Sequence, residues 1–114
     1  MAEEFDIGPV QFDKDSGFAF CDVKNVGRVF LKWDDTGGLW VEVAGVKSKP
    51  RKFADDFLSA ELNVGEELGQ KLGLDEESKI NINKAVLYLA NRVKAEYPKF
   101  AKPDPSKYFD NNSF

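Results

Sequence analysis

The sequence predicts an α+β domain in which an antiparallel four- to five-stranded meander or small barrel packs with C-terminal helices. Short β-branched and aromatic runs separated by turn residues occupy residues 5–46. Apolar residues at helical spacing then occupy most of residues 53–97. Because 114 residues suit one hydrophobic core, we expect a single domain over residues 1–98 and an extended tail over residues 99–114.

Four strands are expected in the N-terminal half, at residues 5–12, 17–23, 27–33 and 39–46. The segments between them are rich in Asp, Asn, Ser and Gly, the residues that favour turns. Strand alternation places Phe18 and Phe20 on the face opposite Ala19 and Cys21. Both faces therefore carry apolar groups. Such a sheet is either covered on both sides, or it presents one face as an exposed aromatic surface with a binding role.

Two short helices are expected after the strands. In the first, residues 52–62, the spacing would set Phe53, Phe57 and Leu58 against the sheet. The second, residues 64–72, would be capped by Asn63 and stopped by Gly73. Its internal glycines at positions 65 and 69 weaken this assignment, because glycine is a poor helix former.

The longest helix is expected over residues 80–97, where apolar residues recur every three or four positions up to Pro98. Its start is ambiguous in the sequence. Residues 80–82 alternate like a strand, and Asn83 could cap a helix that begins at Lys84.

The composition excludes most familiar catalytic chemistry. There is no histidine, and Cys21 is the only cysteine, so Ser-His-Asp triads, Cys-His pairs, intramolecular disulfides and imidazole or cysteine-rich metal sites are impossible. We therefore expect a non-enzymatic protein without a cofactor or metal, and Cys21 is best interpreted as a small buried strand residue. No apolar run is long enough to span a membrane and no secretory signal is evident, so a cytoplasmic location, or the host cytoplasm for a viral protein, is expected.

Charge is distributed unevenly along the chain. The net charge is −4, yet residues 47–52 contain Lys47, Lys49, Arg51 and Lys52 and no acid. The acidic total argues against strong non-specific DNA binding, which needs a basic face that outweighs the acidic remainder. The basic segment is either a solvated loop or an arm that contacts phosphates.

Three segments together resemble the first three strands of the cold-shock domain, a five-stranded OB-type barrel. They are Gly8-Pro9-Val10-Gln11-Phe12, Gly17-Phe18-Ala19-Phe20 and Val29-Phe30-Leu31-Lys32-Trp33. In that family the aromatic residues of these strands stack on the bases of single-stranded nucleic acid. The resemblance implies a stacking platform of Phe12, Phe18, Phe20, Phe30 and Trp33. A meander followed by a helix is also the layout of PC4-like, Whirly and Pur-type single-strand binders, and Sm-like barrels have comparable strands.

The function expected from the sequence is therefore binding of single-stranded DNA or RNA by strand aromatics and a basic turn. The candidate residues are Phe12, Phe18, Phe20, Phe30, Lys32, Trp33, Lys47, Lys49, Arg51 and Lys52. The alternative interpretation of the phenylalanines is hydrophobic core, and by the same reasoning Trp33 and Trp40 pack under the helices.

The rival function is a structural or protein-interaction module, such as an oligomeric phage or viral component or an inhibitor that binds a host protein through its acidic surface. The tail contributes to this alternative, because Tyr108, Phe109 and Phe114 would dock either on their own domain or on a neighbouring subunit of a homo-oligomer.

Overall fold

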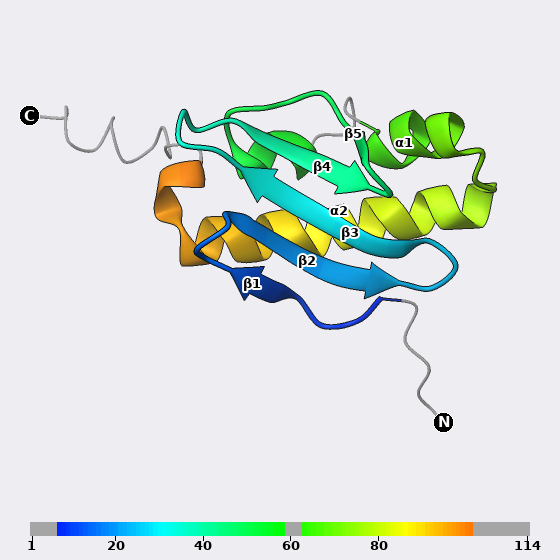
Figure 1. Ribbon diagram of the computed structural model, residues 1–114, viewed down its shortest axis with the longest axis horizontal. Helices are drawn as coiled ribbons and strands as arrows, with labels where there is room; N and C mark the ends of the chain where they lie inside the picture. The colour runs from blue at the N-terminus through cyan, green and yellow to red at the C-terminus, as the bar shows by residue number, and fades with distance from the viewer. Residues whose placement is uncertain (1–6, 59–62, 102–114) are drawn as a thin grey trace, which may run out of the picture.

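The computed structural model of the chain describes residues 7–58 and 63–101, and it has two layers, one sheet and one group of helices. Figure 1 shows the sheet in front and the long helix running behind it. The strands are β1 (Gln11–Asp13), β2 (Phe18–Val23), β3 (Gly27–Trp33), β4 (Leu39–Val43) and β5 (Val46–Lys47). The helices are η1 (Ala54–Leu58), α1 (Val64–Leu72), α2 (Glu76–Glu96) and η2 (Pro98–Phe100). The expected α+β class is confirmed.

The sheet is an open antiparallel meander in the order β1-β2-β3-β4-β5. Of the two forms expected, the meander is present and the closed barrel is not. The expected fourth strand is interrupted by Ala44 and Gly45, whose φ angles of 51° and 83° form a tight turn into β5. The first strand begins later than expected, although Ile7 still bridges to Val23 ahead of it.

The basic segment continues the sheet along the outer edge of β4. Ser48 N donates to Val41 O at 2.8 Å, and Leu39 and Arg51 exchange two backbone hydrogen bonds of 2.7 Å. Residues 47–52, called the basic edge below, are therefore held against the sheet by backbone pairing. This segment is an ordered margin of the sheet rather than a loop extending away from it.

The first expected helix is shorter than predicted. Only residues 54–58 form a helical turn, of the 3₁₀ type, and residues 59–62 lie outside the described residues. Phe57 is buried in the core and η1 packs mainly on α2, whereas Phe53 and Leu58 are only partly buried. The expectation that this segment packs against the sheet is corrected accordingly.

α1 has the predicted boundaries. The Asn63 side chain accepts a hydrogen bond from Glu66 N at 3.0 Å, and Gly73 ends the helix in the left-handed conformation. Gly65 is required by packing, because a Cβ there would collide with the backbone carbonyl of Lys79 on α2. A glycine that weakens the sequence pattern is thus what lets the two helices approach closely.

α2 starts before its predicted position. Asp75 caps it by accepting from Ser78 N at 2.9 Å, so the strand-like residues 80–82 are helical. Asn83 is not a cap but an internal residue that joins the two helices. Its Oδ1 accepts from Gly65 N and its Nδ2 donates to Asn63 Oδ1, both at 2.8 Å.

The core lies between α2 and one face of the sheet. The fully buried large side chains are Leu31, Leu39, Leu68, Ile82 and Leu89, with several valines. Phe100 of η2 is also buried, so the packed part of the chain reaches residue 100. The tail aromatics Tyr108, Phe109 and Phe114 lie outside the described residues. Within residues 7–58 and 63–101, none of the helices has the length and apolar character needed to cross a membrane.

Candidate functional site

The face of the sheet that α2 does not cover carries the aromatic residues of interest. Strand register sets Gln11, Phe20, Phe30, Glu42 and Lys47 in one row across the five strands. A second row contains Asp13, Phe18, Lys32 and Trp40. Among the described residues, no helix lies over these two rows (Figure 1). We call this surface the open face.

Three phenylalanines form a compact cluster at the middle of the open face. The ring centroids of Phe18 and Phe30 are 5.3 Å apart, those of Phe20 and Phe30 are 5.7 Å apart, and those of Phe18 and Phe20 are 5.9 Å apart. All three side chains are partly exposed. Each ring supports the others, so the cluster is a rigid apolar platform that needs no covering element.

Cations lie over the platform. The Arg28 guanidinium is 4.4 Å from the Phe20 ring centroid, and Lys32 Nζ is 5.0 Å from that of Phe30. Both cations are also paired with acids on the same face. Arg28 Nε is 2.9 Å from Asp22 Oδ1, and Lys32 Nζ is 3.3 Å from a Glu42 carboxylate oxygen. The centre of the open face is therefore aromatic with nearly balanced charge.

Trp40 adds a fourth aromatic ring beside the cluster. It pairs with Lys32 across β3 and β4, and Lys47 Nζ lies 5.6 Å from its ring centroid. Its indole Nε1 is buried without a hydrogen-bond partner, so Trp40 offers the site ring surface rather than a hydrogen bond. The alternative that Trp40 packs under the helices is wrong, because register places it on the open face.

Two residues of the expected platform are on the other side of the sheet. Phe12 pairs with Ala19 and contacts Tyr97 with 6.1 Å between ring centroids. Trp33 contacts Tyr97 at 5.3 Å and Phe100 at 5.6 Å, as expected for packing under the helices. The five aromatics that the resemblance groups together are therefore divided between two faces.

The basic edge borders the open face beside Trp40. Lys47 belongs to the open face by register, whereas Arg51 pairs with Leu39, whose side chain lies on the covered face. The side chains of Lys49, Arg51 and Lys52 are all exposed. Lys49 N donates to a Glu67 carboxylate oxygen at 3.0 Å, which fixes this part of the segment to α1. Phosphates bound next to the aromatic platform would meet this margin.

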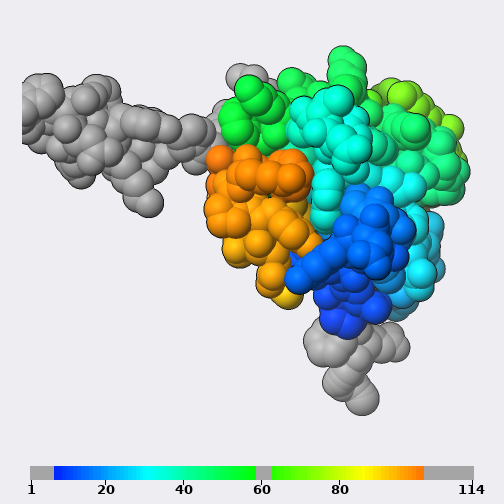
Figure 2. All heavy atoms as spheres, turned by 60° about the vertical axis from the view of Figure 1, so that its left-hand side comes forward, coloured from blue at the N-terminus to red at the C-terminus, as the bar shows by residue number. Residues whose placement is uncertain are grey.

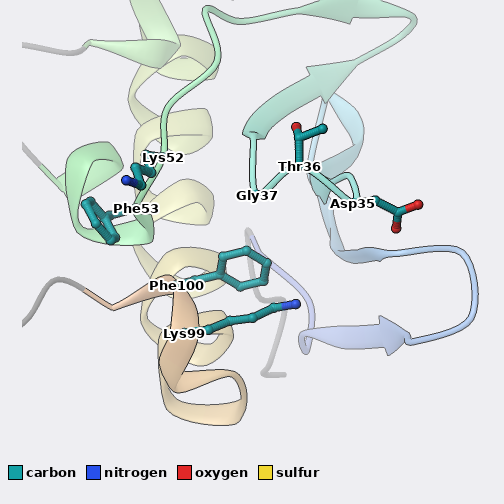
Figure 3. A pocket seen from close by; sticks show the side chains of 7 residues that line it. All are labelled: Asp35, Thr36, Gly37, Lys52, Phe53, Lys99 and Phe100. Atoms are coloured by element: carbon teal, nitrogen blue, oxygen red, sulfur yellow. The ribbon is translucent and has the colours of Figure 1, made fainter.

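A hollow of about 200 Å³ lies at the end of the sheet, where the β3–β4 turn and η2 come together (Figure 2). Figure 3 shows Lys52 and Phe53 on one side of it, the turn with Thr36 and Gly37 on the opposite side, and Lys99 and Phe100 below, between the two. The Asp35 carboxylate is directed away from the hollow. The hollow is smaller than the roughly 300 to 1,000 Å³ of typical ligand pockets. It is therefore small for a typical small-molecule ligand, and the open face is the stronger candidate for a binding surface.

In the described part of the chain, no group of three or more acidic or cysteine side chains is placed to hold a metal ion. Cys21 lies on the covered face and is fully buried. Burial raises the pKa of its thiol to about 11, with a smaller contribution from the negative charge of Asp22. The thiol is consequently a packing group, as the sequence indicated.

Arg28 and Trp40 are the site residues that sequence reasoning missed. The signal for Arg28 was present, because it alternates with Val29 onto the side of Phe30. The signal for Trp40 was the pattern of residues 39–43, in which buried aliphatic residues alternate with Trp40 and Glu42. The same alternation separates Trp33 from Phe30, so the expected platform was too large.

In comparisons with known proteins, no protein-family model, no curated protein and no solved structure matches the chain.

Proposed function

We propose that this protein binds single-stranded nucleic acid, without catalysis, on the open face of its sheet. The observation that carries the proposal is the cluster of Phe18, Phe20 and Phe30, three mutually supported rings on a face that no described helix covers. Every base has a π-face, and each stack on an aromatic side chain contributes about 1 to 3 kcal/mol without selecting a sequence. Open sheets that stack two or three bases in this way are an established means of RNA recognition.

The charges near the platform support backbone contacts at its margin. Arg28 and Lys32 are already paired with Asp22 and Glu42, so they add little attraction for phosphate. The basic edge, in contrast, places Lys47 over Trp40 and adds three more exposed cations along the edge of the sheet. We therefore expect bases on the phenylalanines and phosphates on residues 47–52, with only moderate salt dependence.

The direct test is titration of short single-stranded DNA and RNA oligomers while tryptophan fluorescence is followed. Because Trp33 lies on the covered face, a Trp33→Phe background leaves Trp40 as the reporter of the open face. Phe30→Leu in this background removes the central ring and should weaken binding by roughly fivefold to a hundredfold, the equivalent of one lost stack.

Phe12→Leu is the matched control, because it makes the same chemical change on the other face. Its affinity should stay within about twofold of the parent, since the change removes no stack. Equal losses from both variants, or no binding at low salt, would contradict the proposal.

The electrostatic part is tested separately with Lys47→Glu/Lys49→Glu. This variant should weaken binding and flatten the dependence of log K on log salt by roughly 1 to 2, because each single-strand phosphate contact contributes about 0.7. Lys71→Glu, at an exposed position in the last turn of α1, makes the same kind of charge change in the helix layer and should leave the salt slope unchanged.

One observation favours a second candidate, a protein-interaction module. Charge at the centre of the open face is balanced by the ion pairs Arg28–Asp22 and Lys32–Glu42, a pattern suited to a protein partner with its own apolar centre and polar rim. Affinity for a protein partner that is lost in Phe30→Leu, with no affinity for either nucleic acid, would identify this function instead.

A further inference from the structure

The outer face of α2 carries large apolar side chains with no described covering element. Ile80 and Tyr88 are each 51% exposed and Leu87 is 44% exposed. The exposed residues Lys84, Asn91 and Ala95 complete the same side of the helix. At 100° per residue these six positions, called the outer stripe below, fall within an arc of about 100°. A grouped set of exposed apolar residues is typical of an interaction surface.

We propose that the outer stripe joins two copies of this chain, with their α2 helices antiparallel across a two-fold axis. The spacing of the stripe is symmetric about the point between Leu87 and Tyr88. Ile80 precedes Leu87 by as many residues as Ala95 follows Tyr88, and the same holds for Lys84 and Asn91. A two-fold axis at this level brings Leu87 close to Leu87 of the second copy.

The side chains that face each other in this register are complementary. Ile80 of each copy lies against Ala95 of the other, so a large apolar residue meets a small one. Lys84 lies against Asn91 of the other copy, whose side-chain carbonyl accepts a hydrogen bond from an ammonium. A parallel arrangement would instead oppose Lys84 to Lys84. An isologous interface requires such self-complementarity, and a different protein would have no reason to match the spacing of this stripe.

Charge at the two ends of the helix favours the same arrangement. Glu76 and Glu77 lie in the first turn of α2, while Lys99 follows its C-terminal end. Antiparallel pairing places Glu76 of one copy near Lys99 of the other, and it also opposes the two helix dipoles. The open faces of both copies point away from the contact, so dimerisation leaves the proposed nucleic-acid surface free.

The test is the mass of the full chain in solution, measured by light scattering and sedimentation over a wide range of concentration. We expect a dimer, twice the 12.8 kDa of one chain. Leu87→Glu buries a charge at the two-fold axis and should weaken the dimer by at least about a hundredfold, consistent with an unpaired interface charge. Ser16→Glu, in the exposed β1–β2 turn, adds the same charge elsewhere and should remain dimeric. Circular dichroism confirms that both variants fold.

A cross-linking experiment tests the register itself. Ile80→Cys/Ala95→Cys should form a disulfide-linked dimer on mild oxidation, because the two positions are about 22 Å apart along one helix and can pair only between copies. Either single-cysteine variant should cross-link poorly, and the native Cys21 is buried. A monomer at every concentration, a dimer that survives Leu87→Glu, or single variants that cross-link as well as the double variant would overturn the proposal. A monomer at every concentration would mean that the outer stripe binds another segment of this chain or a different protein.

Discussion

The two faces of the sheet differ in the kind of apolar residue they carry. On β2 the covered face has Ala19 and Cys21, both fully buried, whereas the open face has Phe18 and Phe20, both partly exposed. β3 repeats the contrast, since Leu31 is fully buried while Phe30 retains exposure. At the centre of these two strands the smaller and aliphatic residues thus lie under the helix. The aromatic residues of the covered face, Phe12 and Trp33, lie at the end of the sheet, against Tyr97.

This difference shows how an apolar surface can persist without a covering element. Small residues such as Ala19 allow α2 to approach the sheet and exclude water by close packing. The open-face rings instead pack against each other, edge to face for Phe18 and Phe30 and tilted for the other two pairs, and lie under the cations of Arg28 and Lys32. A face stabilised in this way remains available to a ligand.

The largest difference in stability between variants of the two faces is expected for Leu31 and Phe30, which are neighbours on β3. Leu31→Ala, on the covered face, should lower the free energy of unfolding by about 3 kcal/mol, because it leaves a cavity in the core. Phe30→Ala should lower it by roughly half as much, since that ring is already partly in water. Urea unfolding of the two variants measures both values. Equal losses would show that the open face is as tightly packed as the core.

A substitution in the helix layer, which packs on the covered face, is expected to lower stability nearly as much. Gly65→Ala should destabilise the protein by about 2 to 3 kcal/mol, because a Cβ collides with the Lys79 backbone carbonyl. Gly69→Ala is the matched control on the same helix. Its Cβ would collide with the Lys79 side chain from Cγ outwards, but not with backbone, so that side chain can move aside. Because alanine also favours the helix, a smaller loss than in Gly65→Ala, about 1 kcal/mol or less, is expected in thermal unfolding.

A pH experiment tests whether the covered face of the sheet excludes water. The folded pKa of Cys21 is about 11 against an ordinary value of 9.0, so the folded state keeps a proton that the unfolded chain releases. The protonated Cys21 thiol contributes fully to the free energy of unfolding below pH 9. This contribution is lost as the pH rises towards 11, which lowers the free energy of unfolding by roughly 2 kcal/mol. Cys21→Ala should lose less stability than the parent over this interval. A thiol reagent at pH 8 should leave native Cys21 unmodified, and rapid labelling would contradict its burial.

The smallest effect is expected at the β4–β5 turn, where the sheet passes into the basic edge. Ala44→Gly should stabilise the protein by about 0.5 to 1 kcal/mol, because alanine is strained at a φ of 51°. Ala95→Gly makes the same substitution within α2 and should cost about 1 kcal/mol. Opposite shifts of the two melting temperatures would confirm the turn geometry, whereas a loss of stability in both variants would refute it.

Local signals predicted the boundaries of several elements correctly. Asn63 and Gly73 define α1 because a capping side chain and a left-handed glycine act within one turn of the helix. β2 and β3 follow from alternation and from the turn residues between them. The start of α2 was missed because residues 80–82 fit two periodicities, and the cap at Asp75 decides between them.

The candidate site was predicted in part. Alternation placed Phe18 with Phe20, and the sequence also named Phe30 and Lys32 as candidates; all four lie on the open face. Phe12 was grouped with them wrongly, because the face of β1 depends on its register with Ala19 on β2. That register is set by contacts between strands, which no single segment specifies.

By itself the sequence determined the α+β class, the alternation of each strand and the caps of α1, because these depend on neighbouring residues. Only the tertiary structure decided which face of the sheet α2 covers and which aromatics share a surface. Whether a strand residue is buried depends on the element that packs on it. The element that packs on β2 and β3 is α2, which is far from them along the chain, so the local sequence of the strands does not specify their covered face. The open aromatic face therefore exists only in the folded molecule.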